Sequence, residues 1–195
     1  MTVTSPSDLR NVALVGHQGS GKTTLAEALL HAAGVIGRPG AVPEGTTQSD
    51  YHPSEQDREM SIFTTLLHAD WHGHKINILD TPGYPDFSSE VIAAMKVIDT
   101  AVYVMDARSG VEVGTELAWS YGEQMETPSM FVVKPCRPRR CGCPGHSRRD
   151  RGPLRTRGHG GSVSVRSGVA LHRGRASDGA TALSGGRDDP GSGPD

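Results

Sequence analysis

Short apolar runs alternate with helix-like segments along the first two thirds of the chain. Residues 11–15 (NVALV) form an apolar run that ends at Gly16 and is typical of a buried strand. Residues 22–33 carry apolar side chains at helical spacing before Gly34, and so predict a helix. Residues 100–105 and 129–133 are further apolar runs that predict buried strands. Residues 114–125, between them, predict a helix.

The middle of this region predicts a hairpin and one more helix. Residues 62–70 and 75–79 are strand candidates separated by a short turn, which is hairpin spacing. Residues 86–98 predict a helix, with Asp86 as its N-cap. Residues 37–60 are rich in Gly, Pro, Glu, Asp and Thr, so we expect a long exposed loop there. Alternating strands and helices predict an α/β fold with a mainly parallel sheet flanked by helices.

Composition divides the chain near residue 133. Residues 1–133 hold all nine aromatic residues and carry a net charge of −10, whereas residues 134–195 carry +8 and contain 13 Gly, 12 Arg, 7 Ser and 6 Pro. Such a tail cannot build a core, and we expect it to be disordered. The chain has no apolar run long enough for a membrane span, its start lacks the apolar core of a signal peptide, and all three cysteines lie in the tail. We therefore expect a cytoplasmic protein with no membrane partner.

The strongest chemical motif follows the first predicted strand and opens the first predicted helix. It matches G-x-x-x-x-G-K-[ST], the phosphate-binding loop, with these residues: Gly16, His17, Gln18, Gly19, Ser20, Gly21, Lys22 and Thr23. Glycines let the backbone wrap a phosphate with its N–H groups pointing inward, and the helix N-terminus adds partial positive charge. Lys22 would bridge the β- and γ-phosphates, and the Thr23 hydroxyl would bind Mg²⁺.

Two further segments have the chemistry of a nucleotide switch. Asp80 ends the predicted strand 75–79 and starts Asp-Thr-Pro-Gly, where its carboxylate can hold Mg²⁺ and the Gly83 N–H can meet a γ-phosphate. Ser61 closes the long loop, and its hydroxyl could complete the Mg²⁺ shell. In such a switch, the terminal phosphate holds two loops that hydrolysis releases.

Together these motifs resemble the translational GTPases, and specifically elongation factor G. The resemblance covers about residues 9–133 and rests on four segments in order: Gly16–Thr24, Arg58–Ile62, Asp80–Phe87 and Gly110–Trp119. It implies a P-loop NTPase fold that binds GTP and GDP, hydrolyses GTP with Mg²⁺ and acts at the ribosome. It also implies that Gly16–Thr24, Asp80 and Gly83 bind nucleotide, that Thr23, Ser61 and Asp80 hold the metal, and that Lys22, Gly83 and Tyr84 occupy catalytic positions.

The chain departs from this family at functional positions. Tyr84 replaces the histidine that positions the attacking water, and Gly19 replaces an acidic residue of the phosphate loop. In these changes the chain resembles divergent elongation-factor-G-like paralogues. We expect binding to survive both changes, whereas the change at Tyr84 removes the imidazole that the family links to hydrolysis.

The sequence after Val133 lacks the base-selecting part of the family. Asn-Lys-x-Asp, which selects guanine, is absent, and the chain reads Lys134-Pro135-Cys136 instead. We therefore expect residues 1–133 to be a GTP-binding domain truncated before its last strand and helix, which leaves residues 130–133 as a bare sheet edge. The tail composition is what a GC-rich gene yields when read out of frame. This hypothesis predicts that a one- or two-base correction near Val133 restores the missing motif.

Two other functions of the tail are less well supported by its residues. Arg- and Gly-rich segments bind RNA, but this tail has no aromatic side chain to stack on bases, so we expect no sequence-specific nucleic-acid binding. Its three cysteines and His146 have the spacing C-x₄-C-x-C-x₂-H, which is unlike that of structural zinc sites.

Three functions remain open from the sequence. The first is Mg²⁺-dependent GTP hydrolysis by an elongation-factor-G-like translation factor. The second is a phosphate-binding fragment without guanine selectivity or significant turnover. The third, a P-loop ATPase or kinase of another class, is disfavoured by Asp80–Gly83 and its flanking motifs.

Overall fold

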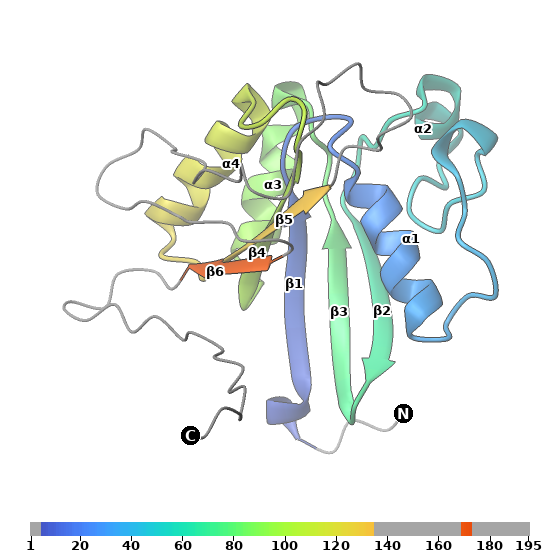
Figure 1. The fold of residues 1–195 in the computed structure, drawn as a ribbon, viewed down its shortest axis with the longest axis horizontal. Coiled ribbons are helices and arrows are strands. Elements are labelled where there is room, and N and C mark those ends of the chain that lie inside the picture. Colours follow the sequence, from blue (N-terminus) through green and yellow to red (C-terminus); the bar gives the residue numbers. More distant parts are fainter. Residues whose placement is uncertain (1–4, 135–168, 173–195) are drawn as a thin grey trace, which may run out of the picture.

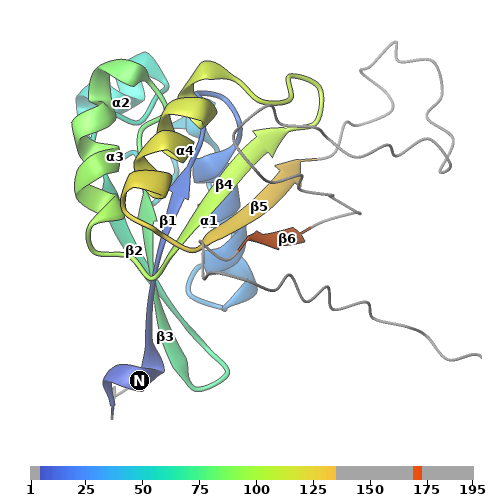
Figure 2. The ribbon, with the colours of Figure 1, turned by 90° about the vertical axis from the view of Figure 1, so that its left-hand side faces the viewer.

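The computed structural model describes residues 5–134 and 169–172. One sheet runs through it, with α1 on one face and α3 and α4 on the other (Figures 1 and 2). The strands are β1 (Leu9–Val15), β2 (Thr65–Trp71), β3 (His74–Asp80), β4 (Thr100–Asp106), β5 (Ser129–Lys134) and β6 (Val169–His172). The helices are α1 (Lys22–Ala32), α2 (Pro53–Arg58), α3 (Ser88–Met95) and α4 (Val113–Gln124), with 3₁₀ turns η1 (Pro6–Asp8), η2 (Val42–Glu44) and η3 (Pro85–Phe87).

The sheet order is β2-β3-β1-β4-β5-β6. Strand β1 is parallel to both β3 and β4, and β4 is parallel to β5, whereas β2 and β6 run antiparallel at the two ends. This arrangement confirms the predicted α/β fold with a mainly parallel sheet. Since the carboxyl ends of β1, β3 and β4 meet at one edge, the segments that follow these strands are gathered there.

Two apolar clusters hold the layers together. Helix α1 buries Ala26 and Leu30 against strand residues such as Leu14 and Ile78. On the other face, α3 and α4 bury side chains against β1, β4 and β5, in a cluster that includes these residues: Val15, Val91, Met95, Tyr103, Ala118 and Phe131. Strand β1 therefore has helices on both sides, which explains its continuous apolar run.

The predicted hairpin is confirmed, with its strands shifted by a few residues. Strands β2 and β3 pair from Thr65 with Asp80 to Trp71 with His74. The two connecting residues, His72 and Gly73, adopt φ of 47° and 83°, and two-residue hairpin turns require such positive values.

The structure corrects three expectations. Residues 37–60 are not simply an exposed loop, because they contain η2 and α2 and bury Ser49, Asp50 and Glu55. Asp86 is not an N-cap, since the chain first makes η3 and α3 then begins after Phe87 without a side-chain cap. Strand β5 is not a bare edge, because β6, from within the tail, pairs with it.

The remaining expectations for the tail, including disorder and the cysteine cluster, lie outside the described residues. Within residues 5–134 and 169–172, no helix is both long and apolar enough to cross a bilayer.

Candidate nucleotide-binding site

The phosphate-binding loop connects β1 to α1 at the carboxyl edge of the sheet. Gly21 is the residue before the helix and adopts φ of 100°, which places α1 with its first turn facing the loop. Ser20 donates its backbone N–H to His17 O at 3.3 Å, closing the loop on itself. Strand, loop and helix thus have the order that the motif requires for a phosphate cradle.

Lys22 lies at the centre of this loop with a side chain that is almost fully buried. Its Nζ donates to the backbone oxygens of Gly16 and His17, each at 3.0 Å. Burial lowers the pKa of Lys22 to about 8, while the carboxylates of Asp80 and Asp50 act in the opposite direction. An ammonium group held this way, in a site of low dielectric, is poised to attract the oxygens of a phosphate.

The predicted metal-binding residues converge beside Lys22. The Thr23 and Ser61 hydroxyl oxygens lie 3.3 Å apart, and the Ser49 hydroxyl donates to Asp80 Oδ2 at 2.6 Å. Asp80 is completely buried, and burial raises its pKa to about 6. Its other oxygen, Oδ1, has no hydrogen-bond partner within the described part of the chain. A buried carboxylate oxygen without a donor is costly alone and is stabilised by a cation.

Asp50 is a candidate site residue that the sequence did not point to. It is 3% exposed, and neither carboxylate oxygen has a hydrogen-bond partner among residues 5–134 and 169–172. Burial raises its pKa, and its charge interacts with those of Lys22 and Asp80. No periodicity or motif marks this position, and only an acidic residue in a long polar segment could have drawn attention to it.

Magnesium fits this set of oxygen donors. Hydroxyl and carboxylate oxygens are the ligands that it prefers, and it usually also takes water and phosphate oxygens. Among the described residues no group of three His, Cys, Asp or Glu side chains is arranged to hold a metal. Thr23, Ser61 and Asp80 would hold the ion, with Asp50 beside them.

Gly83 packs directly on the phosphate-binding loop. A Cβ atom on this residue would lie 2.5 Å from Lys22 Nζ and 2.6 Å from the backbone nitrogen of Gln18. Only glycine therefore allows Asp-Thr-Pro-Gly to approach the loop this closely. The close approach places the Gly83 backbone beside the Lys22 ammonium and the backbone of Gln18.

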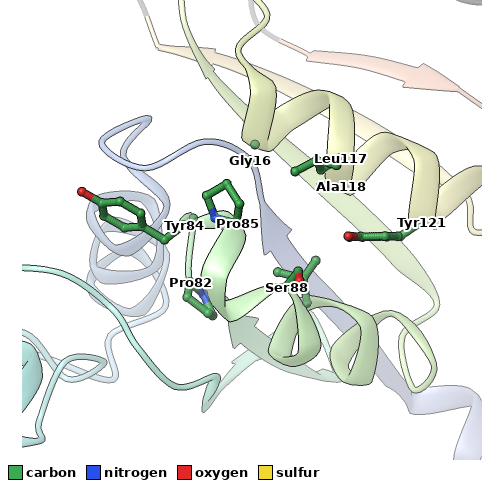
Figure 3. A pocket seen from close by; sticks show the side chains of 11 residues that line it. Gly16, Pro82, Tyr84, Pro85, Ser88, Leu117, Ala118 and Tyr121 are labelled. Atoms are coloured by element: carbon green, nitrogen blue, oxygen red, sulfur yellow. The ribbon is translucent and has the colours of Figure 1, made fainter.

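Tyr84 lies next to Gly83 at the rim of a small cavity. The cavity has a volume of about 20 Å³, enough for one water molecule, and lies between the segment after β3, the start of α3, and α4. Figure 3 shows Leu117 and Tyr121 of α4 on one side and the ring of Tyr84 extending away, with its hydroxyl group outward. Tyr84 therefore does not fill the cavity.

His17 joins the loop to α4. Its Nδ1 accepts a hydrogen bond from the Gly114 N–H at 3.3 Å, its backbone N–H donates to Thr115 Oγ1 at 3.3 Å, and its Nε2 lies 3.7 Å from Glu112 Oε1. The imidazole thus binds the helix start, which indicates a positioning role in the loop.

The loop residues of the predicted site differ in exposure. Gln18, Gly19 and Thr24 are exposed, whereas Ser20 is buried and its hydroxyl has no partner within the described residues.

Three charged residues, Asp106, Arg108 and Lys134, form a cluster next to the phosphate-binding loop, at the ends of β4 and β5. Asp106 contacts Arg108 Nη2 at 3.0 Å and Lys134 Nζ at 3.3 Å, and its pKa is held well below the usual range by Arg108 first and by Lys134. A Cβ on Gly21 would lie 3.5 Å from Lys134 Nζ, so this lysine is adjacent to the loop. Lys134 follows directly after Val133, the point beyond which the sequence lacks the base-selecting motif of the family.

Comparisons with known proteins agree with this geometry. The model of the elongation factor Tu GTP binding domain matches residues 7–134. The elongation factor G-like protein of Mycobacterium tuberculosis is 42% identical over 132 residues, which are 68% of this chain and 18% of that protein. The mitochondrial ribosome-releasing factor 2 of Candida dubliniensis is 42% identical over 127 residues, covering 65% of this chain and 16% of that protein.

A solved structure shares both sequence and fold. A crystal structure of a protein from Thermus thermophilus matches with a TM-score of 0.62 and 46% identity, over 64% of this chain and 19% of that one. The chain thus spans about a sixth to a fifth of the length of these relatives. The family model covers β1 to β5 together with the phosphate-binding loop and the segment after β3, and the chain is similar in sequence to elongation factor G-like proteins. The chain therefore belongs to the family of the elongation factor Tu GTP binding domain.

Proposed function

We propose that this chain binds GTP together with Mg²⁺ and hydrolyses it, as the nucleotide-binding domain of an elongation-factor-G-like translation factor that acts at the ribosome in the cytoplasm. We also propose residues 1–133 as the nucleotide-binding unit and residues 134–195 as a low-complexity tail, from which β6 pairs with β5. The observation that carries the first proposal is the convergence of Thr23, Ser61 and Asp80 beside the buried ammonium of Lys22.

Each residue has a role that follows from its place in the site. The backbone N–H groups of Gly16–Thr24 would surround the phosphates, and Lys22 would neutralise part of their charge. Bound Mg²⁺ would supply further positive charge to the phosphate oxygens. Gly83 would donate its N–H to the terminal phosphate from its position against Lys22. Tyr84, next in the chain, would face the water that attacks this phosphate.

A second function is favoured by the residues at the base-binding side. The chain has no Asn-Lys-x-Asp, and Lys134 is engaged with Asp106. Loss of two charge-assisted hydrogen bonds to guanine costs on the order of 3–6 kcal/mol, or roughly 10²- to 10⁴-fold in affinity. The chain would then bind nucleoside triphosphates through their phosphates alone, without guanine selectivity and with little turnover.

Titration of the full chain with fluorescent GTP and ATP analogues, with and without Mg²⁺, separates these functions. Mg²⁺-dependent binding that prefers GTP, with phosphate release, supports the GTPase. Equal and weak binding of both analogues supports the phosphate-binding fragment. Lys22→Ala should reduce binding at least 100-fold, whereas Lys96→Ala, which changes an exposed lysine, should leave it unchanged. If the Lys22 variant binds as tightly as the native chain, this loop is not the nucleotide site.

A further inference from the structure

The metal side of the site depends on a segment with little regular structure. Residues 40–50 contain only the short turn η2, yet they deliver Ser49 and Asp50 to the neighbourhood of Asp80. A segment of this kind needs fixed contacts to hold its buried polar groups in place. Glu27 of α1 supplies them.

The carboxylate of Glu27 is buried and binds the segment at two points. Its Oε2 accepts the Gly40 N–H at 2.8 Å, and its Oε1 accepts the Gln48 N–H at 2.6 Å. Glu27 is 1% exposed, so these charge-assisted bonds form away from bulk water, where they are strong. Both oxygens of one side chain thus fix the two ends of the stretch 40–48.

The stretch also closes on itself between these two points. Ala41 donates its N–H to Thr46 Oγ1 at 2.9 Å, and the Thr46 N–H donates to Ala41 O at 3.4 Å. A Cβ on Gly40 would overlap the carbonyl group of Thr46 and lie 2.7 Å from Thr47 Cα. Only glycine at position 40 therefore lets the stretch keep this closed shape while it reaches Glu27.

The residues that follow Gln48 go directly into the site. Ser49 donates its hydroxyl to Asp80 at 2.6 Å, and its carbonyl accepts the Thr65 hydroxyl at 2.9 Å. Asp50 comes next, with both carboxylate oxygens buried. The positions of Ser49 and Asp50 are thus set within one or two residues of the bond between Gln48 and Glu27.

Glu27 itself lies one helical turn after Thr23 on α1. Helix α1 begins with Lys22 and Thr23, which the proposed function assigns to phosphate and metal. The same helix therefore also carries Glu27, which binds the segment that contains Ser49 and Asp50. We propose that Glu27 is a positioning residue: its carboxylate couples α1 to residues 40–50, and so holds Ser49 and Asp50 in place for Mg²⁺ binding. This inference rests on the proposed function for the identity of the ligand.

The test compares two charge-removing variants, Glu27→Gln and Glu44→Gln. In Glu27→Gln, the amide NH₂ group faces one of the two backbone N–H donors, so one bond is lost. Glu44 is exposed and lies in the same segment, so its variant is a matched control. The Mg²⁺ concentration that half-saturates the enhancement of fluorescent GTP binding should rise at least tenfold in Glu27→Gln, while GTP affinity in EDTA changes less than twofold. An unchanged Mg²⁺ requirement, or an equal loss of affinity with and without Mg²⁺, would overturn the inference.

A second pair of variants covers the case in which Glu27→Gln does not fold. Gly40→Ala disturbs the same contact from the segment side and leaves α1 intact, whereas Gly37→Ala introduces a Cβ that meets nothing within 4 Å. Gly40→Ala should reproduce the raised Mg²⁺ requirement, and Gly37→Ala should not. If Gly40→Ala behaves like the native chain, Glu27 does not act through this stretch.

Amide hydrogen exchange separates failure of this inference from failure of the proposed function. If the native chain binds no nucleotide, the proposed function is refuted. In the same nucleotide-free protein, the amides of Gln48 and Asp50 should exchange at least tenfold faster in Glu27→Gln than in Glu44→Gln. Equal exchange rates in the two variants would refute the positioning role, whether or not nucleotide binds.

Discussion

The Thr23 hydroxyl oxygen lies 3.3 Å from that of Ser61, although 38 residues separate them in the chain. Thr23 is in the first turn of α1, and Ser61 follows α2, just before β2. The two hydroxyls thus come from the two segments that the sequence analysis assigned to the phosphate-binding loop and to the end of the long loop. A divalent cation placed between them would link these segments directly.

Removal of the Ser61 hydroxyl tests this link. We expect Ser61→Ala to raise the Mg²⁺ concentration needed for nucleotide binding about tenfold, the equivalent of one lost ligand interaction of about 1.4 kcal/mol. Titration of fluorescent GTP binding with Mg²⁺ measures the effect. Ser61→Thr keeps the hydroxyl and should bind Mg²⁺ normally, and Ser54→Ala, on the exposed side of α2, should have no effect. A normal Mg²⁺ requirement in Ser61→Ala would remove Ser61 from the metal site.

Asp80→Asn should separate stability from metal binding. Burial raises the pKa of Asp80 from 3.8 to about 6, so the folded chain holds this proton more tightly than the unfolded chain does. The corresponding stability is present below pH 3.8 and is lost as the pH rises through about 6. Without metal, Asp80→Asn should therefore gain about 1–3 kcal/mol over the native chain between pH 5 and pH 7.5, since a tenfold change in proton affinity is about 1.4 kcal/mol.

Denaturant unfolding at the two pH values measures this gain in Asp80→Asn, and Asp57→Asn, at an exposed position, serves as the control. The same Asp80 variant should lose at least tenfold in Mg²⁺ affinity. A variant that is destabilised equally at both pH values would show that the Asp80 charge is not costly in the folded chain.

Nucleotide affinity should fall as the pH rises through about 8. Burial lowers the pKa of Lys22 from 10.5 to about 8, so above that pH the free site contains a neutral amine. The folded chain then holds fewer protons than the unfolded chain, and Lys22 contributes increasing stability from pH 8 toward pH 10.5. A bound phosphate needs the ammonium form, so its affinity should drop several-fold from pH 7 to pH 9. Titrations at these pH values should show the drop in the native chain and a flat, weak response in Lys22→Met. A native chain whose affinity is flat over this range would show that the lysine remains charged.

Tyr84→His should increase turnover without changing binding. Tyr84 lies beside Gly83 and directs its ring away from the small cavity, so an imidazole can be placed at the same position without a clash in that cavity (Figure 3). Positioned acid–base groups typically contribute about 10²- to 10⁴-fold to a rate. We expect at least a tenfold faster single-turnover hydrolysis of GTP, with GTP affinity within twofold of the native value. Tyr84→Phe should hydrolyse GTP no faster than the native chain does. If Tyr84→His is no faster either, another part of the site limits the reaction.

The parts of the site that could be predicted are those formed by motifs of consecutive residues. The phosphate-binding loop is specified by eight consecutive residues between an apolar run and a helical pattern, and the structure places it between β1 and α1. Asp80 could be placed because it ends a strand that is parallel to β1, and parallel strands end at the same edge.

The parts that could not be predicted depend on contacts between distant residues in segments without periodicity. Nothing in the sequence near Asp50 shows that it is buried, because the segment before it contacts the fold through Gly40 and Gln48, which bond to the distant Glu27. Strand β6 is four residues long and lies in a Gly- and Arg-rich context, so its pattern was too short to predict a partner for β5. The expected N-cap at Asp86 was wrong because η3 precedes α3 and moves the helix start beyond it.

The sheet order also sets the sequence in which the site can be assembled during folding. Strands β2 and β3 meet through a two-residue turn, and such hairpins form in about 1–10 μs. Strand β1 must instead pair Leu9 with Lys75 and Val12 with Thr100, contacts between distant parts of the chain that form late because of their loop-closure entropy. We expect the loop after β1 and Asp80 after β3 to come together only in that late step. A nucleotide that binds there would act after the rate-limiting transition, so it would lengthen the lifetime of the folded chain and leave its folding rate almost unchanged.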